Sequence, residues 1–130
     1  MKKSVLILDD NPVNNRKYID PLKEKFQVDV TLRMRSATRL LKTRHYDVVV
    51  IDIMMPSQHL SDNDEMIAGF NYYEEEVSKL GINSKILFWS RLTDSCFDKA
   101  KYSDEDKFHF VHKSESANHL LKSIEALFNV

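Results

Sequence analysis

Short apolar runs alternate along this chain with longer segments in which apolar residues recur every three or four positions. The runs are four to five residues long and rich in Val, Ile, Leu and Phe, whereas the longer segments have the period of an α-helix. Strands that alternate with helices build βαβ units around a parallel sheet that is buried on both faces. The pattern therefore predicts an α/β fold with strands over 3–8, 28–33, 47–52, 85–90 and 107–112.

The first two helices have recognisable starts. Asn11 before Pro12 is typical of a helix start, because a capping residue there precedes proline at the first helical position. Pro21 lies inside this helix and is expected to kink it, since proline lacks an amide donor and clashes with the preceding turn. Ser36 is the expected cap of a short second helix. Between these helices the strand over 28–33 alternates apolar and polar residues, which predicts an edge strand with one wet face.

Three further helices are expected in the second half of the chain. The third runs from near Gly69 to Leu80, with Gly81 as its C-terminal cap. The fourth covers about 93–101. The last follows Ser114 as cap and carries one clear apolar face.

Composition is that of an ordinary globular domain. The 130 residues are 42% hydrophobic and 30% charged, which predicts one domain over 1–130 with a core of its own. The net charge of −1 gives no global field that would favour nucleic acid or a membrane surface. A single cysteine, Cys96, excludes an internal disulfide. With no apolar run of membrane-spanning length and no signal peptide, we expect a cytoplasmic protein.

Polar residues of different chemistry follow four of the five predicted strands. Asp9 and Asp10 end the first and Asp52 ends the third, while Ser90 and Lys113 end the fourth and fifth. The carboxyl ends of parallel strands form the edge where open α/β sheets bind ligands. Three carboxylates suit a hard cation such as Mg²⁺, and a hydroxyl and an ammonium suit a phosphoryl group.

Each of these residues also has an ordinary structural role open to it. Asp10 before Asn11 is a common turn residue, Ser90 is a possible cap for the next helix, and Lys113 a possible surface lysine. Their joint placement at strand ends favours the site. Gly69 and Gly81 are the only glycines, and neither follows a strand into a helix, so no glycine-rich phosphate loop is present. Phosphate chemistry here would rest on side chains and a metal.

With these residues in order, the whole chain resembles the response regulator receiver domain of two-component signalling. Asp9-Asp10 resembles the acidic pair of the family, and the stretch 52–56, reading DIMMP, resembles its phosphoacceptor motif. Ser90 falls where the family has its switch hydroxyl, and Lys113 where it has its phosphate-pairing lysine. Phe110 matches the switch aromatic.

The resemblance implies a flavodoxin-like (βα)₅ three-layer sandwich with a doubly wound sheet in the order 2-1-3-4-5. It implies Asp52 as the residue that is phosphorylated, with Lys113 as counter-ion and Ser90 and Phe110 as switch residues. It also implies Mg²⁺ held by Asp10, Asp52 and the backbone carbonyl of Met54, with Asp9 reaching the ion mainly through water.

Three features depart from the family pattern. Ser114 stands where proline usually follows the lysine, and Arg91 stands where a small residue usually follows the switch hydroxyl. The stretch 57–66, reading SQHLSDNDEM, is acidic and without periodicity, and resembles a loop insertion beside the site.

The implied function is that of a phosphoacceptor rather than an enzyme. A histidine kinase or histidine phosphotransfer protein would donate the phosphoryl group to Asp52. The face formed by the helix over 93–101, the last strand and the last helix would then change and bind a downstream protein. Because the chain ends after the last helix, we expect a stand-alone receiver, monomeric or weakly dimeric, that binds neither nucleic acid nor membrane.

Two other functions fit the residues. The first is a degenerate receiver that acts as a binding module without phosphorylation, with the insertion or Arg91 blocking the site. The second is a metal-dependent phosphohydrolase with an aspartate nucleophile. Haloacid dehalogenase-type enzymes have an Asp-x-Asp motif after the first strand, whereas this chain has adjacent Asp9 and Asp10.

Overall fold

Five parallel strands form one sheet in the order β2-β1-β3-β4-β5. A computed structural model describes residues 2–53, 68–90, 102, 104, 106–113 and 116–128. Each strand lies within two residues of the predicted segment, and the edge position of β2 is confirmed. The strands are β1 (Ser4–Leu8), β2 (Gln27–Thr31), β3 (Val48–Asp52), β4 (Lys85–Ser90) and β5 (Phe108–His112).

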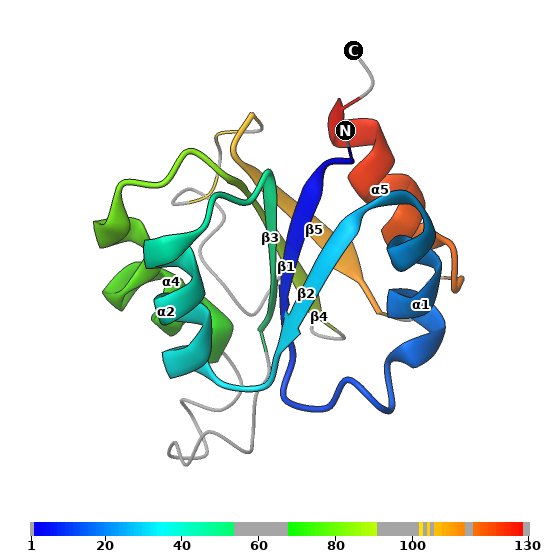
Figure 1. Cartoon of the computed structure of the whole chain (residues 1–130), viewed down its shortest axis with the longest axis horizontal. Helices are drawn as coiled ribbons and strands as arrows, with labels where there is room; N and C mark the ends of the chain where they lie inside the picture. The colour runs from blue at the N-terminus through cyan, green and yellow to red at the C-terminus, as the bar shows by residue number, and fades with distance from the viewer. Residues whose placement is uncertain are drawn as a thin grey trace.

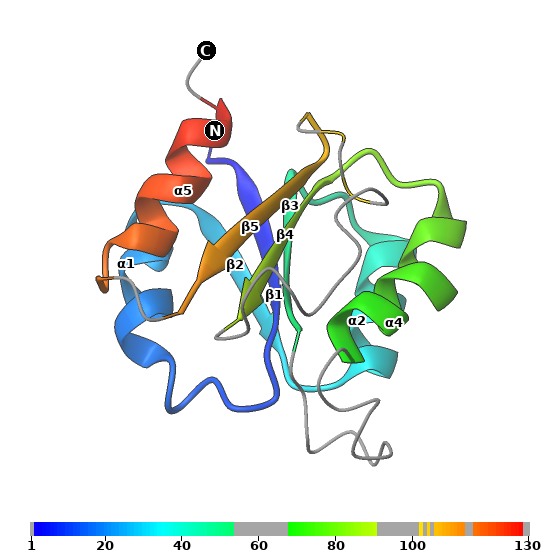
Figure 2. The same cartoon turned by 180° about the vertical axis from the view of Figure 1, so that it is seen from behind.

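Helices cover both faces of the sheet, as Figures 1 and 2 show from opposite sides. α1 (Arg16–Lys25) and α5 (His119–Phe128) lie on one face. α2 (Met34–Thr43), α4 (Ala68–Glu75) and the 3₁₀ helix η2 (Val77–Leu80) lie on the other. The predicted doubly wound, three-layer α/β architecture is therefore confirmed.

The alternation of side chains along the central strands divides the core into two layers. Val48 and Val50 of β3 face α1 and α5, whereas Val49 and Ile51 face α2 and α4. Because β3 is buried at every position, it reads as an unbroken apolar run until it reaches Asp52. The apolar run of this buried strand thus ends at the carboxyl edge of the sheet, and Asp52 is the polar residue that stands there.

The first two helices begin at different residues from those predicted. α1 starts at Arg16 rather than near Pro12, because the backbone N–H of Asn11 donates to Asp9 and the chain turns through residues 12–15 first. Asn15 occupies the N-cap position, but its side chain makes no capping bond. α2 starts at Met34, so Ser36 lies within its first turn instead of capping it.

The third predicted helix is two helices in the structure. α4 ends at Glu75, and η2 follows after Glu76, whose φ of −123° leaves the helical region. Gly81 ends η2 with φ of 67°, which confirms its role as a left-handed cap. The helix predicted over 93–101 lies outside the described residues, as does Ser114. Among the described residues, no helix is long and apolar enough to cross a bilayer.

Candidate functional site

Three aspartates meet where β1 and β3 end side by side. Asp9 follows β1, Asp10 follows Asp9, and Asp52 is the last residue of β3. One carboxylate oxygen from each lies within 4.8 Å of the others. The chain passes from β1 to β2 on one side and returns to β3 on the other, so this is the point where the strand order reverses. Ligands of doubly wound sheets bind at such a point.

Asp9 is completely buried and both of its carboxylate oxygens accept hydrogen bonds from the chain. The backbone N–H of Asn11 donates to Oδ1 at 3.0 Å, and Nδ2 of Asn15 donates to Oδ2 at 2.7 Å. Asn15 is itself buried. These bonds satisfy a buried charge and fix its orientation. Asp9 is thus a carboxylate braced by the chain on both of its oxygens, and the indirect role that the resemblance implies for it stays a prediction.

Lys113 forms a buried ion pair with Asp52. Its Nζ lies 2.8 Å from Oδ2 of Asp52, and the two side chains are 9% and 5% exposed. The N–H of Lys113 donates to the carbonyl of Ser90 at 2.9 Å, which ties the end of β5 to the end of β4. Lysines are rarely buried unless they are paired, so the fold gives this one a specific partner.

Trp89 and Tyr18 are site residues that the sequence does not reveal as such. Trp89 pairs in register with Asp52 on the neighbouring strand, and Lys113 Nζ lies 4.5 Å from the centre of its ring. Tyr18 packs edge-on against Trp89 with 5.3 Å between ring centres, and its hydroxyl donates to the carbonyl of Lys113. The position of Trp89 in its strand could have indicated where its ring lies. Because side chains alternate along a strand, Trp89 is on the same face of the sheet as Leu87.

Ser90 ends β4 and Phe110 lies on β5, and their role as switch residues stays a prediction. Ser90 is buried. Phe110 is 39% exposed, and its ring stacks on that of Phe88 with 5.5 Å between centres and 25° between planes. Phe70 and Tyr102 complete an aromatic cluster beneath it. The two residues therefore belong to adjoining strands, on the side of the sheet covered by α4.

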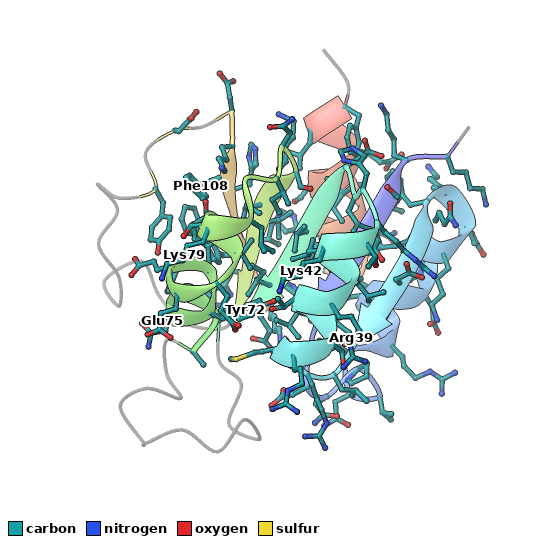
Figure 3. All side chains as sticks on the ribbon, turned by 60° about the vertical axis from the view of Figure 1, so that its left-hand side comes forward. Arg39, Lys42, Tyr72, Glu75, Lys79 and Phe108 are labelled. Atoms are coloured by element: carbon teal, nitrogen blue, oxygen red, sulfur yellow. The ribbon has the colours of Figure 1, made fainter. Side chains whose placement is uncertain are left out.

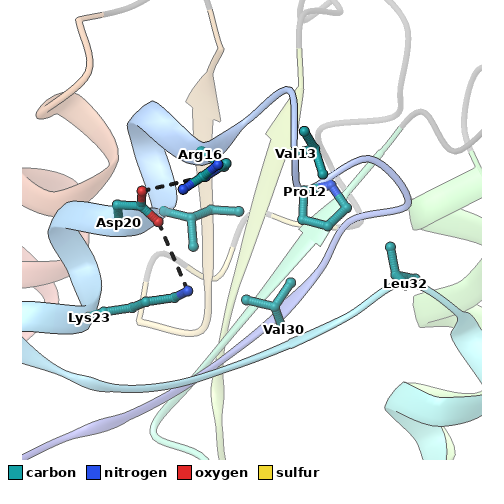
Figure 4. Close-up of a pocket in the computed structure, with 8 residues that line it drawn as sticks. Pro12, Val13, Arg16, Asp20, Lys23, Val30 and Leu32 are labelled. Carbon is teal, nitrogen blue, oxygen red and sulfur yellow. Dashed lines mark ion pairs between the residues drawn. The ribbon is translucent and has the colours of Figure 1, made fainter.

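Four features of the predicted site lie outside the described residues: the Met54 carbonyl, Arg91, Ser114 and the stretch 57–66. A hollow of about 340 Å³ lies between the start of α1 and β2, and Figure 4 shows its walls. Its charged residues pair with each other at the surface, since Asp20 lies 3.8 Å from Arg16 and 4.0 Å from Lys23. The hollow includes none of the three clustered aspartates.

The donor set fits a divalent cation. Three carboxylates and the single ammonium of Lys113 leave the cluster with two formal negative charges, which one Mg²⁺ ion would balance. All three donors are oxygens, and one of them is partly exposed to solvent. The residues that could hold the ion are therefore Asp9, Asp10 and Asp52.

A parallel sheet in the order β2-β1-β3-β4-β5 with helices on both faces defines the class of flavodoxin-like α/β proteins, and the three aspartates lie where its strand order reverses. Within that class, the sequence model of the response regulator receiver domain matches residues 5–125, so the chain belongs to this family. No curated protein matches the chain.

Solved receiver domains share the fold at low sequence identity. The receiver domain of the Francisella response regulator 1452 is 24% identical, with a TM-score of 0.71 over 97% of this chain and 96% of that one. A CheY-like receiver domain from Methylobacillus flagellatus is 19% identical, with a TM-score of 0.73 over 98% and 99%. The Vibrio cholerae chemotaxis protein CheY4 is 18% identical, with a TM-score of 0.71 over 98% and 99%.

Proposed function

We propose that this chain accepts a phosphoryl group on Asp52 and thereby switches a protein-binding face. The observation that carries the proposal is the buried Asp52, which has Lys113 Nζ at 2.8 Å and two further carboxylates clustered beside it. Membership of the receiver family supports the same role. The donor would be the phosphohistidine of a histidine kinase or histidine phosphotransfer protein.

The transfer moves a phosphoryl group from nitrogen to oxygen. A carboxylate oxygen of Asp52 attacks phosphorus, the P–N bond of the phosphohistidine breaks, and its electron pair returns to the imidazole, which then takes a proton from water. Lys113 offsets the negative charge that collects on the carboxylate and on the transferred oxygens. Asp9, Asp10 and Asp52 would hold Mg²⁺, which supplies further charge neutralisation at the phosphoryl oxygens.

The switch would pass through Ser90 and Phe110. The Ser90 hydroxyl would turn toward the new phosphoryl group, and the partly exposed ring of Phe110 would turn inward behind it. This change would alter the face that carries β5 and α5, where a downstream protein would bind.

Mass spectrometry after incubation with Mg²⁺ and acetyl phosphate tests the proposal. We expect one added phosphoryl group in the wild-type chain and none in Asp52→Asn. If no adduct forms, and beryllofluoride with Mg²⁺ produces no spectral change, the phosphoacceptor function is wrong and a binding module remains. Rapid multiple turnover of a small phosphomonoester would instead favour a phosphohydrolase.

A further inference from the structure

Tyr18 reaches the active lysine from a helix at the opposite end of the sequence. It lies in the first turn of α1 and is buried, and its hydroxyl donates to the backbone carbonyl of Lys113, 95 residues along the chain. The N–H of Lys113 is bound to Ser90. Both polar groups of the Lys113 backbone are therefore held, one by the neighbouring strand and one by a helix.

The ammonium of the Lys113 side chain lies over the aromatic ring of Trp89. Its Nζ lies 4.5 Å from the centre of the Trp89 ring and 2.8 Å from Oδ2 of Asp52. An ammonium within about 6 Å of an indole face is attracted by the negative face of the ring, most strongly when both are shielded from water. Trp89 is completely buried, and Tyr18 packs edge-on against it.

We propose that Tyr18 is a positioning residue for Lys113, acting through the Lys113 carbonyl, with the Trp89 ring as the surface along which the ammonium is aimed at Asp52. A lysine side chain has four rotatable bonds, so its ammonium stays in one place only when its backbone and its stem are both constrained. Tyr18 supplies the first constraint and Trp89 the second. The inference rests on the proposed function, which needs Lys113 beside the carboxylate that is phosphorylated.

A purely structural role for Tyr18 makes a different prediction. Its ring belongs to the core between the sheet and α1, and Tyr18→Phe keeps that ring while it removes the hydroxyl. If the Tyr18 hydroxyl acts by positioning the Lys113 ammonium, its loss changes the rate of phosphorylation only in a chain that has this ammonium. If it merely stabilises the fold, its loss has the same effect with and without Lys113. A double-mutant cycle separates the two roles.

The first arm of the cycle measures the rate of adduct formation with acetyl phosphate and Mg²⁺. We expect Tyr18→Phe to lower the rate about fivefold, the scale of one net hydrogen bond. In the Lys113→Met background, which is slower throughout, the same substitution is expected to leave the rate unchanged. An equal loss in both backgrounds would show that Tyr18 does not act through the lysine.

The second arm uses the emission of Trp89, the single tryptophan of the chain, and requires no phosphoryl transfer. Lys113→Met removes the ammonium from the ring and is expected to change the emission intensity. Tyr18→Phe should change it in the same direction and add nothing in the Lys113→Met background. Unchanged emission in Tyr18→Phe would overturn the inference.

Tyr72→Phe is the matched control. Tyr72 is a buried tyrosine of α4 whose hydroxyl lies 2.7 Å from the Thr38 hydroxyl of α2, on the other face of the sheet, and it is labelled in Figure 3. We expect it to change neither rate nor emission, and an equal effect there would overturn the inference. Absence of any adduct in the wild-type chain would refute the proposed function, whereas the emission cycle would still decide whether Tyr18 positions Lys113.

Discussion

Gly69 of α4 packs directly against the peptide of Asp52. A Cβ atom on Gly69 would lie 2.7 Å from Cα of Ile53 and closer still to the carbonyl oxygen of Asp52, while the N–H of Gly69 donates to the Ile53 carbonyl at 2.8 Å. The start of α4 is thus held against the end of β3 by direct backbone contact. The proposed phosphoacceptor owes its position to a residue that lies 17 places later in the chain.

Gly69→Ala should therefore disturb both stability and phosphorylation. The methyl group cannot be accommodated without moving backbone, and overpacking of this kind typically costs about 1–3 kcal/mol. Because the displaced backbone carries Asp52, we expect slower adduct formation with acetyl phosphate in addition to a lower urea midpoint.

Gly81→Ala is the control for this change. Gly81 has φ of 67°, and a Cβ there would meet nothing within 4 Å. Its substitution is expected to cost about 1 kcal/mol through backbone strain and to leave the rate of phosphorylation unchanged. A rate in Gly69→Ala that equals the wild-type rate would show that the contact serves the fold alone.

Asp10 is the aspartate whose removal tests the cation site most directly. Three carboxylates within 4.8 Å repel one another, so Asp10→Asn should raise the free energy of unfolding without Mg²⁺, by on the order of 1 kcal/mol. It should also abolish stabilisation by Mg²⁺, which for the wild-type chain is expected to raise Tm by mass action. Thermal melts with and without Mg²⁺ measure both effects.

Asp20→Asn is the matched variant, because Asp20 is an exposed acid of α1 that pairs with Arg16 and Lys23. Its loss should change stability little and leave the response to Mg²⁺ intact. A full Mg²⁺ response in Asp10→Asn would exclude Asp10 from the ion site.

The fold could be predicted from the sequence because it depends on periodicity. The buried strands of a parallel sheet read as continuous apolar runs, and the run that leads to Asp52 is buried at every position. The candidate site could be predicted from the residues at the strand ends, since the carboxyl ends of parallel strands lie at one edge of the sheet. Asp9, Asp52, Ser90 and Lys113 all lie at that edge.

Features that depend on specific side-chain contacts, near in the chain or far along it, could not be predicted. Asn11 has the sequence of a helix cap, but Asp9 binds its N–H and also takes the side chain of Asn15, so α1 begins later. The bond from Tyr18 to Lys113 joins two elements with no pattern in common. Local propensity carries no information about such pairs.

Asn15→Ala is expected to weaken the fold through Asp9. Asn15 donates to Oδ2 of the completely buried Asp9 at 2.7 Å, and a hydrogen bond to a charged group contributes about 1.5–3 kcal/mol. Urea unfolding should show a loss of that size. Asn14→Ala, a neighbouring substitution at an exposed residue, should be within about 0.5 kcal/mol of wild type. Equal midpoints for the two variants would contradict the bracing role of Asn15.

Asp47 gives the fold a predictable response to acid. Partial burial alone would raise the pKa of its carboxyl, but hydrogen bonds from the N–H and hydroxyl of Ser4 and the nearby charges of Lys3 and His45 outweigh burial and lower the pKa below its usual 3.8. A carboxyl whose pKa is lower in the folded state stabilises the fold above its unfolded pKa, and that contribution is lost as pH falls through the folded pKa. Asp47→Asn should therefore be less stable than wild type at pH 7, and the difference in urea midpoint should shrink as pH is lowered beneath 3.8. A difference that stays constant from pH 7 to the acid limit of folding would show that the charge of Asp47 contributes nothing.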